Sequence, residues 1–250
     1  MELADVRALV TGGASGMGRC FVEQLEASGA KVFFCDVNAE GVAQASAETG
    51  APGTVADVSS EEDVARMFAE ACDAIGPVNV LVNNAGIIRD GLLVKRDRDT
   101  GELIGLPRAR WDQVLAVNLT GPFLCMREFA LGCLRDSVRP AVAINMSSVT
   151  RVGNVGQSNY AATKAGLVAD TTLWARELAR HGIRVGAVAP GYIATPMVSS
   201  MRPEVLEKVI DPVPLKRLGE PEEIWQAVRF VIACEYFTGR VIEVDGGLRL

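Results

Sequence analysis

Tyr160 and Lys164, a tyrosine and a lysine four residues apart, are the pair best suited to proton transfer. In a helix this spacing places both side chains on one face, one turn apart. Because a nearby ammonium group stabilises a phenolate, we expect Lys164 to lower the pKa of Tyr160 from about 10 and make it an acid or base near neutral pH. Such pairs also arise by chance on exposed helices, so this one needs support from its surroundings.

A glycine-rich segment, Thr11 to Gly18, lies between an apolar run and a helical pattern. Glycines let main-chain N–H groups and a helix N-terminus approach a pyrophosphate, whose charge the helix dipole favours. The spacing Gly12-x-x-x-Gly16-x-Gly18 differs from the commoner G-x-G-x-x-G pattern, and a tight strand-to-helix connection is an alternative explanation. No Gly-Lys-Ser/Thr sequence follows, which argues against a nucleoside triphosphatase.

Asp36 ends the second apolar run, where a carboxylate can accept hydrogen bonds from the adenosine ribose and repel a 2′-phosphate. Neither Ser15 nor Val37 offers the basic group that compensates such a phosphate, so we predict NAD rather than NADP. The alternative is a helix cap, because Asp36 and Asn38 both suit that position.

Seven short apolar runs rich in β-branched residues predict strands that are buried on both faces. They are Arg7–Val10, Lys31–Cys35, Gly53–Val55, Val78–Val82, Ala141–Ile144, Ile183–Val188 and Val241–Val244. Helical periodicity separates them, at Gly18–Ala27, Glu61–Ala74, Trp111–Leu134, Ala161–Arg180 and Pro221–Ala233. The alternation predicts one α/β domain of Rossmann type, a doubly wound sheet of about seven parallel strands with helices on both faces and ligands at the carboxyl ends of the strands.

Composition narrows the class of partner. The chain has 250 residues, 49% of them hydrophobic, and a formal net charge of -6, which argues against nucleic acid or an anionic membrane surface and favours a small molecule. No leader pattern or run of eighteen apolar residues is present, so we expect a cytoplasmic protein. The six scattered cysteines predict neither a disulfide framework nor a metal site, and the single histidine, His181, sits at a predicted helix end.

Several motifs stand in register with the glycine turn and the Tyr160/Lys164 pair. They are Asn83-Asn84-Ala85-Gly86, Asn118, Ser147-Ser148, Pro190-Gly191, Arg217 to Glu223, and Val244-Asp245-Gly246-Gly247. In this order the motifs resemble the short-chain dehydrogenase/reductase family, and the resemblance extends from Arg7 to Gly247. A set of motifs in register is far more specific than any one of them.

The resemblance implies a catalytic set of Asn118, a serine, Tyr160 and Lys164. Tyr160 would exchange a proton with the substrate oxygen, and the serine would hydrogen-bond the same oxygen. Lys164 would lower the pKa of Tyr160 and hold the nicotinamide ribose. Asn118 would support a chain of water molecules that relays the proton. A structural amide that bonds to a kinked helix is the alternative for Asn118. The cofactor contacts would come from Gly12, Ser15, Gly16, Met17, Gly18, Asp36, Val37, Asp57, Val58, Asn84, Ala85, Gly86, Tyr160, Lys164, Pro190, Gly191, Ile193 and Thr195.

Two counts place the catalytic serine differently. Counting forward from Ile144-Asn145 gives Ser148, whereas counting back thirteen residues from Tyr160 gives Ser147. A strand fixes side-chain direction with period two and a loop absorbs a deletion readily, so we prefer Ser148 with Ser147 as the alternative.

Two segments beyond the shared motifs bear on the substrate side of the site. About ten extra residues relative to many relatives fall near 95–106, where Asp99-Thr100-Gly101 predicts a hairpin. This hairpin is either a solvated excursion, which we favour, or a wall of the substrate cleft or a subunit contact. Residues 192–215 occupy the position of the family's substrate lid.

The leading functional hypothesis is NAD-linked oxidation of a secondary alcohol, or the reverse reduction, in a homotetramer as the resemblance implies. The alternative within this chemistry is a 3-oxoacyl carrier-protein or coenzyme A thioester reductase, which Gly156-Gln157-Ser158-Asn159-Tyr160 resembles. A hypothesis of a different class is a non-catalytic NAD-binding regulatory protein, and the intact Asn118, Tyr160 and Lys164 set weighs against it.

Overall fold

The structure is a computed structural model that describes residues 1–195, 198 and 203–250. All seven predicted strands form one sheet, with every neighbouring pair parallel. The strands are β1 (Arg7–Thr11), β2 (Lys31–Asp36), β3 (Gly53–Val55), β4 (Val80–Asn83), β7 (Ala141–Met146), β8 (Ile183–Pro190) and β9 (Val241–Val244). Their order is β3-β2-β1-β4-β7-β8-β9, so the order in which strands are added to the sheet reverses between β1 and β4, the place where such sheets bind ligands.

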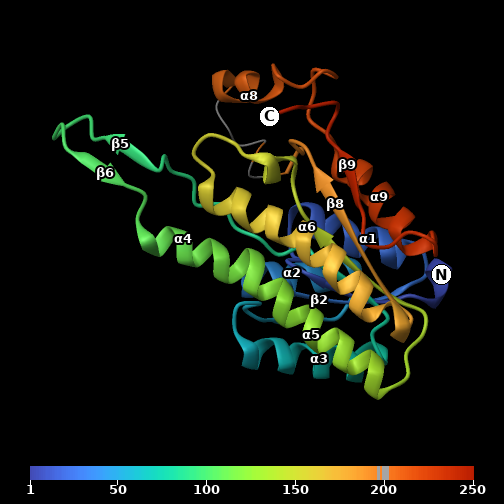
Figure 1. Cartoon of the computed structure of the whole chain (residues 1–250). Coiled ribbons are helices and arrows are strands. Elements are labelled where there is room, and N and C mark those ends of the chain that lie inside the picture. The colour runs from blue at the N-terminus through green and yellow to red at the C-terminus, as the bar shows by residue number, and fades with distance from the viewer. Residues whose placement is uncertain (196–197, 199–202) are drawn as a thin grey trace.

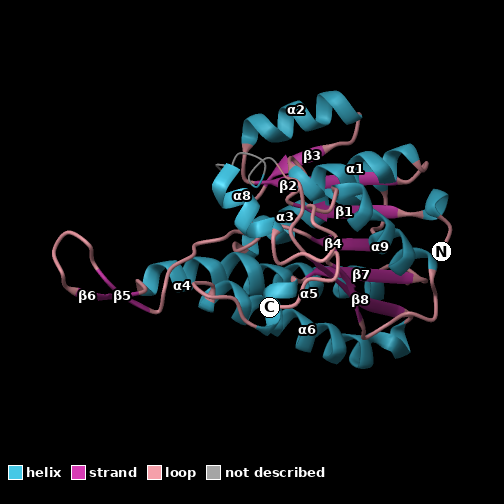
Figure 2. Cartoon of the chain, turned by 90° about the horizontal axis from the view of Figure 1, so that it is seen from above, coloured by secondary structure: helices cyan, strands magenta, loops and turns pink. Residues whose placement is uncertain are grey.

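Side-chain alternation along the strands builds a core on each face of the sheet. In β1, Ala8 and Val10 join the cluster under α1 (Gly16–Ala27), α2 (Ala39–Thr49) and α9 (Pro221–Ala233). Leu9 joins the opposite cluster, under α3 (Glu61–Ile75), α5 (Gly121–Arg135) and α6 (Ser158–Leu178). Both clusters are fully apolar at their centres, which explains why the strands read as continuous apolar runs. Figures 1 and 2 show the resulting three layers of helix, sheet and helix.

The helices follow the predicted periodicity with three differences. Their bounds are α1 (Gly16–Ala27), α2 (Ala39–Thr49), α3 (Glu61–Ile75), α4 (Arg108–Leu115), α5 (Gly121–Arg135), α6 (Ser158–Leu178), α8 (Pro203–Ile210) and α9 (Pro221–Ala233). First, α2 was not predicted, because only Val42 and Ala45 of its eleven residues are buried and its apolar period is weak. Second, the helix predicted over Trp111–Leu134 contains a π-helical segment at Ala116–Thr120. Third, α1, α4 and α6 begin two or three residues earlier than predicted, at Gly16, Arg108 and Ser158.

The predicted hairpin is present and projects from the body as an arm, visible in Figures 1 and 2. β5 (Val94–Arg96) pairs antiparallel with β6 (Leu103–Gly105), and every residue of both strands is exposed. Asp97 shapes the turn, because its Oδ1 accepts the N–H groups of Asp99 and Thr100 at 3.0 Å. An isolated pair of strands is only marginally stable in water, so the Asp97 turn and the β5–β6 pairing are the contacts that stabilise the arm.

Residues 108–135 form one continuous helical stretch that is long and apolar enough to cross a membrane by length and composition, the only such stretch among the described residues. Its apolar side includes Leu124, Cys125 and Phe129, which are buried in the cluster between α3, α5 and the sheet. The apolar character of this stretch is therefore that of a core helix.

The predicted lid falls partly on described residues. Residues 203–210 form α8, which begins at Pro203, and Ile193 bridges to Gly219. Residues 196, 197 and 199–202, which include the lid positions Pro196, Met197 and Met201, lie outside the described residues.

Candidate active site

The glycine turn and the loop after β4 meet at the switch point of the sheet. The Oγ1 of Thr11 accepts the N–H groups of Asn84 and Ala85, both at 3.0 Å. Asn84 also bonds to the glycine turn through its side chain, whose Nδ2 donates to the carbonyls of Thr11 and Gly12 at 3.0 and 3.1 Å. A Cβ at Gly18 would lie 2.0 Å from the Gly12 carbonyl oxygen, so this glycine permits the close packing of helix against turn. The role of Gly18 is thus one of packing within the turn.

The N-terminus of α1 is suited to an anion. Its N-cap residue, Ser15, makes no side-chain capping hydrogen bond, and the first turn contains no acidic residue. The first N–H groups of a helix have no partner within the helix, and the helix dipole adds positive potential there. Gly16, at φ 54°, lines the cavity beside them, so these residues fit the pyrophosphate of a dinucleotide.

Asp36 is held at the end of β2 by two main-chain groups. Its Oδ2 accepts the N–H of Ala14 at 3.2 Å and its Oδ1 accepts the N–H of Asn38 at 3.1 Å. The cap of α2 is Asn38, whose Oδ1 accepts the N–H of Gly41 at 3.1 Å. The two alternatives for this region therefore belong to different residues: Asn38 caps the helix, and Asp36 lines the cavity.

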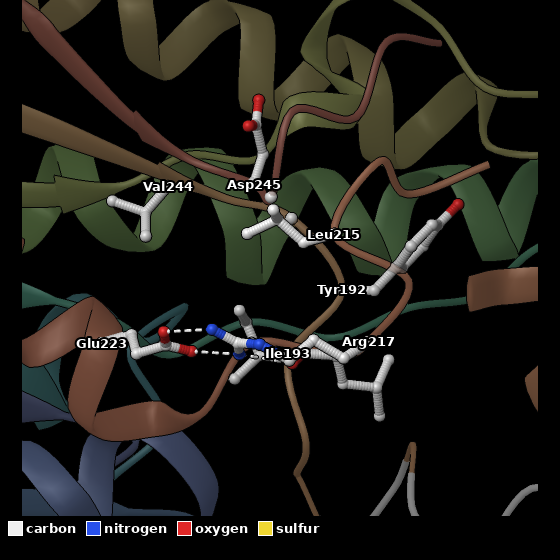
Figure 3. Close-up of a pocket in the computed structure, with 11 residues that line it drawn as sticks. Tyr192, Ile193, Leu215, Arg217, Glu223, Val244 and Asp245 are labelled. Carbon is white, nitrogen blue, oxygen red and sulfur yellow. Dashed lines mark hydrogen bonds and ion pairs between the residues drawn. The ribbon is translucent and has the colours of Figure 1, made fainter. Parts of the chain in front are cut away.

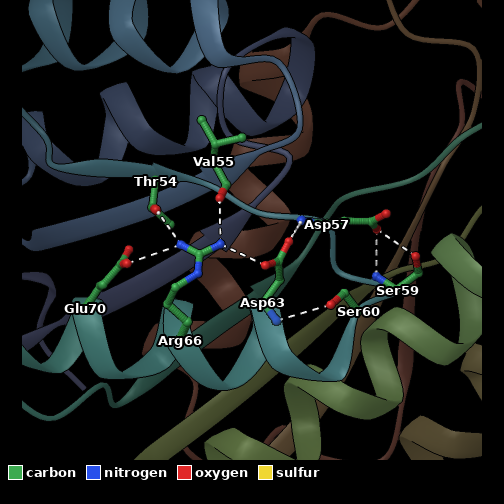
Figure 4. A network of polar contacts seen from close by, with 8 residues as sticks. All are labelled: Thr54, Val55, Asp57, Ser59, Ser60, Asp63, Arg66 and Glu70. Carbon is green, nitrogen blue, oxygen red and sulfur yellow. Dashed lines mark hydrogen bonds and ion pairs between the residues drawn. The ribbon is translucent and has the colours of Figure 1, made fainter.

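Asp57 lies one strand further along the same edge, in the polar network of Figure 4. Its Oδ1 accepts the Ser59 hydroxyl at 2.7 Å, and its N–H donates to Asp63 at 2.9 Å. Arg66 extends the network, because its guanidinium bonds to Asp63 at 2.9 Å and to the Val55 carbonyl at 2.9 Å. These bonds lower the pKa of Asp63 and fix the backbone at Asp57, which lines the cavity with Val58.

Lys164 and Tyr160 lie on one face of α6, as their spacing predicts. The Lys164 Nζ lies 5.4 Å from the centroid of the Tyr160 ring and donates to the Met146 carbonyl at 2.7 Å. Burial lowers the pKa of Lys164 to about 8. The pKa of Tyr160, however, is raised to about 12 by burial, an effect that a hydrogen bond with Ser148 opposes and the Asp90 charge increases.

The expected lowering of the tyrosine pKa is therefore wrong for this structure. Desolvation of the phenol is the largest cause of the raised pKa, and the ammonium group of Lys164 donates its hydrogen bond to the main chain of β7. A protonated Tyr160 is suited to donate its proton to a carbonyl oxygen.

The two serines have different partners. The Ser147 hydroxyl donates to the main-chain carbonyl of Lys164 at 2.8 Å and so joins β7 to α6. The Ser148 hydroxyl accepts from the Thr150 hydroxyl at 3.0 Å, and it lies close enough to the Tyr160 phenol to lower its pKa. Ser147 borders the cavity, but Ser148 is the serine whose side chain contacts the tyrosine.

Asn118 lies in the π-helical segment and is fully buried. Its amide clamps the loop after β4, with Oδ1 accepting the N–H of Ile87 at 2.8 Å and Nδ2 donating to the Ile87 carbonyl at 2.9 Å. A Cβ at Gly86 would lie 3.5 Å from the Asn118 Oδ1 and 3.7 Å from the Lys164 Nζ. Gly86 thus marks the point where β4, the π-helical segment and α6 converge.

Asn159 also positions the site, and it was not predicted. It is fully buried beside Tyr160, and its Nδ2 donates to the carbonyls of Arg89 and Arg110 at 3.1 and 3.2 Å. Its Oδ1 accepts the N–H of Tyr160 at 2.8 Å. These bonds hold the first turn of α6 against the loop after β4 and against α4. Because their partners are main-chain atoms, no sequence pattern predicts them.

One cavity of about 680 Å³ joins most of these groups. The predicted residues that line it are Gly12, Ser15, Gly16, Met17, Asp36, Val37, Asp57, Val58, Asn84, Ala85, Gly86, Ser147, Tyr160, Lys164 and Thr195. Ile87, Ile88, Val117 and Met146 line it as well and were missed, because apolar residues beside a site look like ordinary core residues in the sequence. The cavity thus connects the Asp36 end of the sheet with the Tyr160 end.

Some predicted cofactor residues lie elsewhere. Gly191 and Ile193 border a second, smaller cavity of about 110 Å³, which Figure 3 shows beside Tyr192 and Leu215. Ile193 is buried in the core, and Pro190 ends β8 without lining the larger cavity. The smaller cavity is lined by a two-pronged ion pair in which the two terminal nitrogens of Arg217 each lie 2.7 Å from a Glu223 oxygen. This ion pair lowers the pKa of Glu223 to about 2.

The chain matches the family profile described as enoyl-(acyl carrier protein) reductase over residues 12–249. It is 41% identical to an acetoacetyl-CoA reductase of Synechocystis sp., an alignment that covers 98% of this chain and 97% of the relative. It is 38% identical to the human (3R)-3-hydroxyacyl-CoA dehydrogenase, covering 99% and 97%, and to the 3-oxoacyl-acyl-carrier-protein reductase of Thermotoga maritima, covering 99% of each. The chain therefore belongs to the short-chain dehydrogenase/reductase family of oxidoreductases, in its branch of 3-oxoacyl reductase-like proteins.

Proposed function

We propose that this protein transfers a hydride between NAD(H) and the C3 position of a 3-oxoacyl or 3-hydroxyacyl thioester. The observation that carries the proposal is the single cavity with Asp36 at one end and Tyr160 and Lys164 at the other. A volume of about 680 Å³ lies within the range of small-molecule and cofactor sites. The nicotinamide ring, when bound, supplies or accepts the hydride.

The residues of the chain would supply binding and proton transfer. In ketone reduction Tyr160, protonated because of its raised pKa, donates its proton to the oxygen at C3. Ser148 hydrogen-bonds the same oxygen and stabilises the developing negative charge. Lys164, held by the Met146 carbonyl, orients the ribose beside Tyr160, and Asn118 keeps the loop at Ile87 in place.

The choice of thioester over a general secondary alcohol rests on the relatives. Three relatives that cover nearly the whole chain are named for acetoacetyl-CoA, 3-hydroxyacyl-CoA or 3-oxoacyl carrier-protein substrates. The same catalytic residues would serve other secondary alcohols, which remain the second candidate class. Turnover of acetoacetyl-CoA, compared with cyclic and aliphatic ketones, separates the two.

The choice of NAD rests on Asp36. Its carboxylate is fixed in the cavity by Ala14 and Asn38, and the described residues that line this cavity include only one base, Lys164, at the opposite end. Without a base beside it, the carboxylate would repel a 2′-phosphate. We expect Asp36→Asn to lower kcat/KM with NAD by about tenfold and to raise it with NADP, since hydrogen bonds to charged groups contribute about 1.5–3 kcal/mol.

The control for that experiment is Asp57→Asn, which removes a carboxylate from the same cavity at the neighbouring strand end. It should leave the ratio of NAD to NADP activity within about threefold of the unaltered protein. Equal use of both cofactors by the unaltered protein, or an unchanged ratio in Asp36→Asn, would contradict the assignment.

We also propose assembly as a homotetramer. Apolar side chains on α5, Phe123, Leu131 and Leu134, are 45%, 49% and 46% exposed and form a stripe at helical spacing that fits a subunit contact. Light scattering on the purified protein tests this proposal directly.

A further inference from the structure

Five aliphatic side chains lie exposed on two segments close to the catalytic helix, and none of them belongs to the core. They are Ile88, Leu92, Leu93, Val152 and Val155, with exposed fractions of 38%, 47%, 69%, 70% and 86%. We call this set the apolar rim. Isolated exposed aliphatic residues are ordinary, but adjoining ones mark a binding surface.

Hydrogen bonds bring the two segments of the apolar rim together. The N–H of Gly91 donates to the Gly156 carbonyl at 2.8 Å, and the Gln157 Nε2 donates to the Asp90 Oδ2 at 3.0 Å. A Cβ at Gly156 would lie 3.9 Å from the carbonyl carbon of Gly91, so the two backbones are in contact there. Leu92 and Val155, the next residues along each segment, therefore adjoin.

The apolar rim is continuous with the cavity that holds the catalytic groups. Ile88 belongs to both, because it lines the cavity and is also 38% exposed. Asn159 fixes the loop that follows Ile88 to the first turn of α6, immediately before Tyr160. Ile88 therefore lies where the cavity meets the surface, on the same loop as Leu92.

We propose that the apolar rim binds the hydrocarbon tail of the acyl thioester and makes the protein prefer tails longer than acetoacetyl. This inference rests on the proposed function. A hydrocarbon tail fits because all five side chains are aliphatic, whereas the pantetheine arm on the other side of C3 carries amides that need polar partners. The one acidic side chain between them, Asp90, is bonded to Gln157.

The test is the ratio of kcat/KM for 3-oxodecanoyl-CoA to kcat/KM for acetoacetyl-CoA. We expect the unaltered protein to favour 3-oxodecanoyl-CoA. Leu92→Ser and Val155→Ser should each reduce kcat/KM for 3-oxodecanoyl-CoA by about fivefold and leave kcat/KM for acetoacetyl-CoA unchanged, because only the long tail reaches these side chains. The matched control is Leu103→Ser, a side chain 67% exposed on the far strand of the arm, which should leave the ratio unaltered.

The outcomes separate this inference from the function beneath it. If the unaltered protein reduces acetoacetyl-CoA but the ratio is the same in Leu92→Ser and Val155→Ser, the apolar rim does not bind the tail and the inference is overturned. An equal loss of kcat/KM with both thioesters in these variants also overturns the inference and indicates a structural role for the apolar rim. A smaller native mass of the variants with no change in the ratio overturns it as well and indicates a subunit contact. No turnover of either thioester by the unaltered protein contradicts the proposed function itself.

Discussion

The Nζ of Lys164 lies 5.4 Å from the ring centroid of Tyr160, and its hydrogen bond goes to the main-chain carbonyl of Met146. The lysine is buried, and its pKa falls to about 8, while that of Tyr160 rises to about 12. The pKa values of these two groups on one helix face are thus shifted in opposite directions, and each shift favours the neutral form of its group. Burial of the pair is a cost in stability that the catalytic arrangement requires.

Replacing the lysine should therefore stabilise the protein near neutral pH. The pKa of Lys164 is lower in the folded state than its ordinary value of 10.5, so below pH 8 the full penalty of the buried charge applies. As pH rises from 8 to 10.5 the unfolded chain keeps the proton that the folded chain has released, and the penalty disappears. We expect Lys164→Met to raise the free energy of unfolding at pH 7 by about 1–2 kcal/mol, after allowing for the lost hydrogen bond, and to abolish turnover.

Urea denaturation at pH 7 and pH 10 checks this prediction, because the advantage of Lys164→Met should vanish at the higher pH. The control is Lys216→Met, which replaces a lysine that is 64% exposed and paired with Asp211, and should change stability by less than about 0.5 kcal/mol. A destabilised Lys164→Met protein at pH 7 would show that the hydrogen bond outweighs desolvation.

The two adjacent serines should respond differently to replacement by alanine. Ser148→Ala removes the hydroxyl beside Tyr160 and should lower kcat by about a hundredfold, and the loss of its two hydrogen bonds from Thr150 should cost about 1 kcal/mol of stability. Ser147→Ala removes the bond to the Lys164 carbonyl and should cost about 1 kcal/mol of stability while turnover stays within about threefold. Steady-state kinetics and thermal unfolding of both variants decide the assignment, and the opposite pattern would make Ser147 the catalytic serine.

The arm should be dispensable for folding. Replacing residues 95–104 by Asn-Gly keeps the pairing of Val94 with Gly105 and supplies a two-residue turn. Because all the removed residues except Asp97 are exposed, we expect stability to change by less than about 0.5 kcal/mol and the kinetics and native mass to stay the same. A raised KM in this variant would mean that the arm walls the substrate cleft, and a smaller mass would mean that it contacts another subunit.

The sheet was predictable from sequence because its signals are local. Strands buried on both faces read as apolar runs, and Asp36, Tyr160 and Lys164 follow from their places after a strand or along a helix. The hairpin followed from Asp99-Thr100-Gly101, where Gly101 takes the left-handed conformation at φ 74°. Each of these predictions depends on neighbours within a few residues.

The remaining features depend on partners far along the chain. The bonds of Lys164 to Met146 and of Asn118 to Ile87 involve main-chain atoms that any residue would offer, so they leave no sequence pattern. The raised pKa of Tyr160 depends on how completely the fold buries the phenol, which residue spacing does not reveal. Likewise, the burial of the Ile193 side chain in the core depends on residues far along the chain.

The most direct test of the proposed function is the absorbance of NADH formed from NAD and a 3-hydroxybutyryl thioester by the unaltered protein and by Tyr160→Phe. We predict steady NADH formation by the unaltered protein, a rate lower by about a thousandfold in Tyr160→Phe, and NAD affinities within about threefold of each other, because only the group that accepts the hydroxyl proton is removed. Retained turnover in Tyr160→Phe, or no NADH from the unaltered protein despite NAD binding, would contradict it.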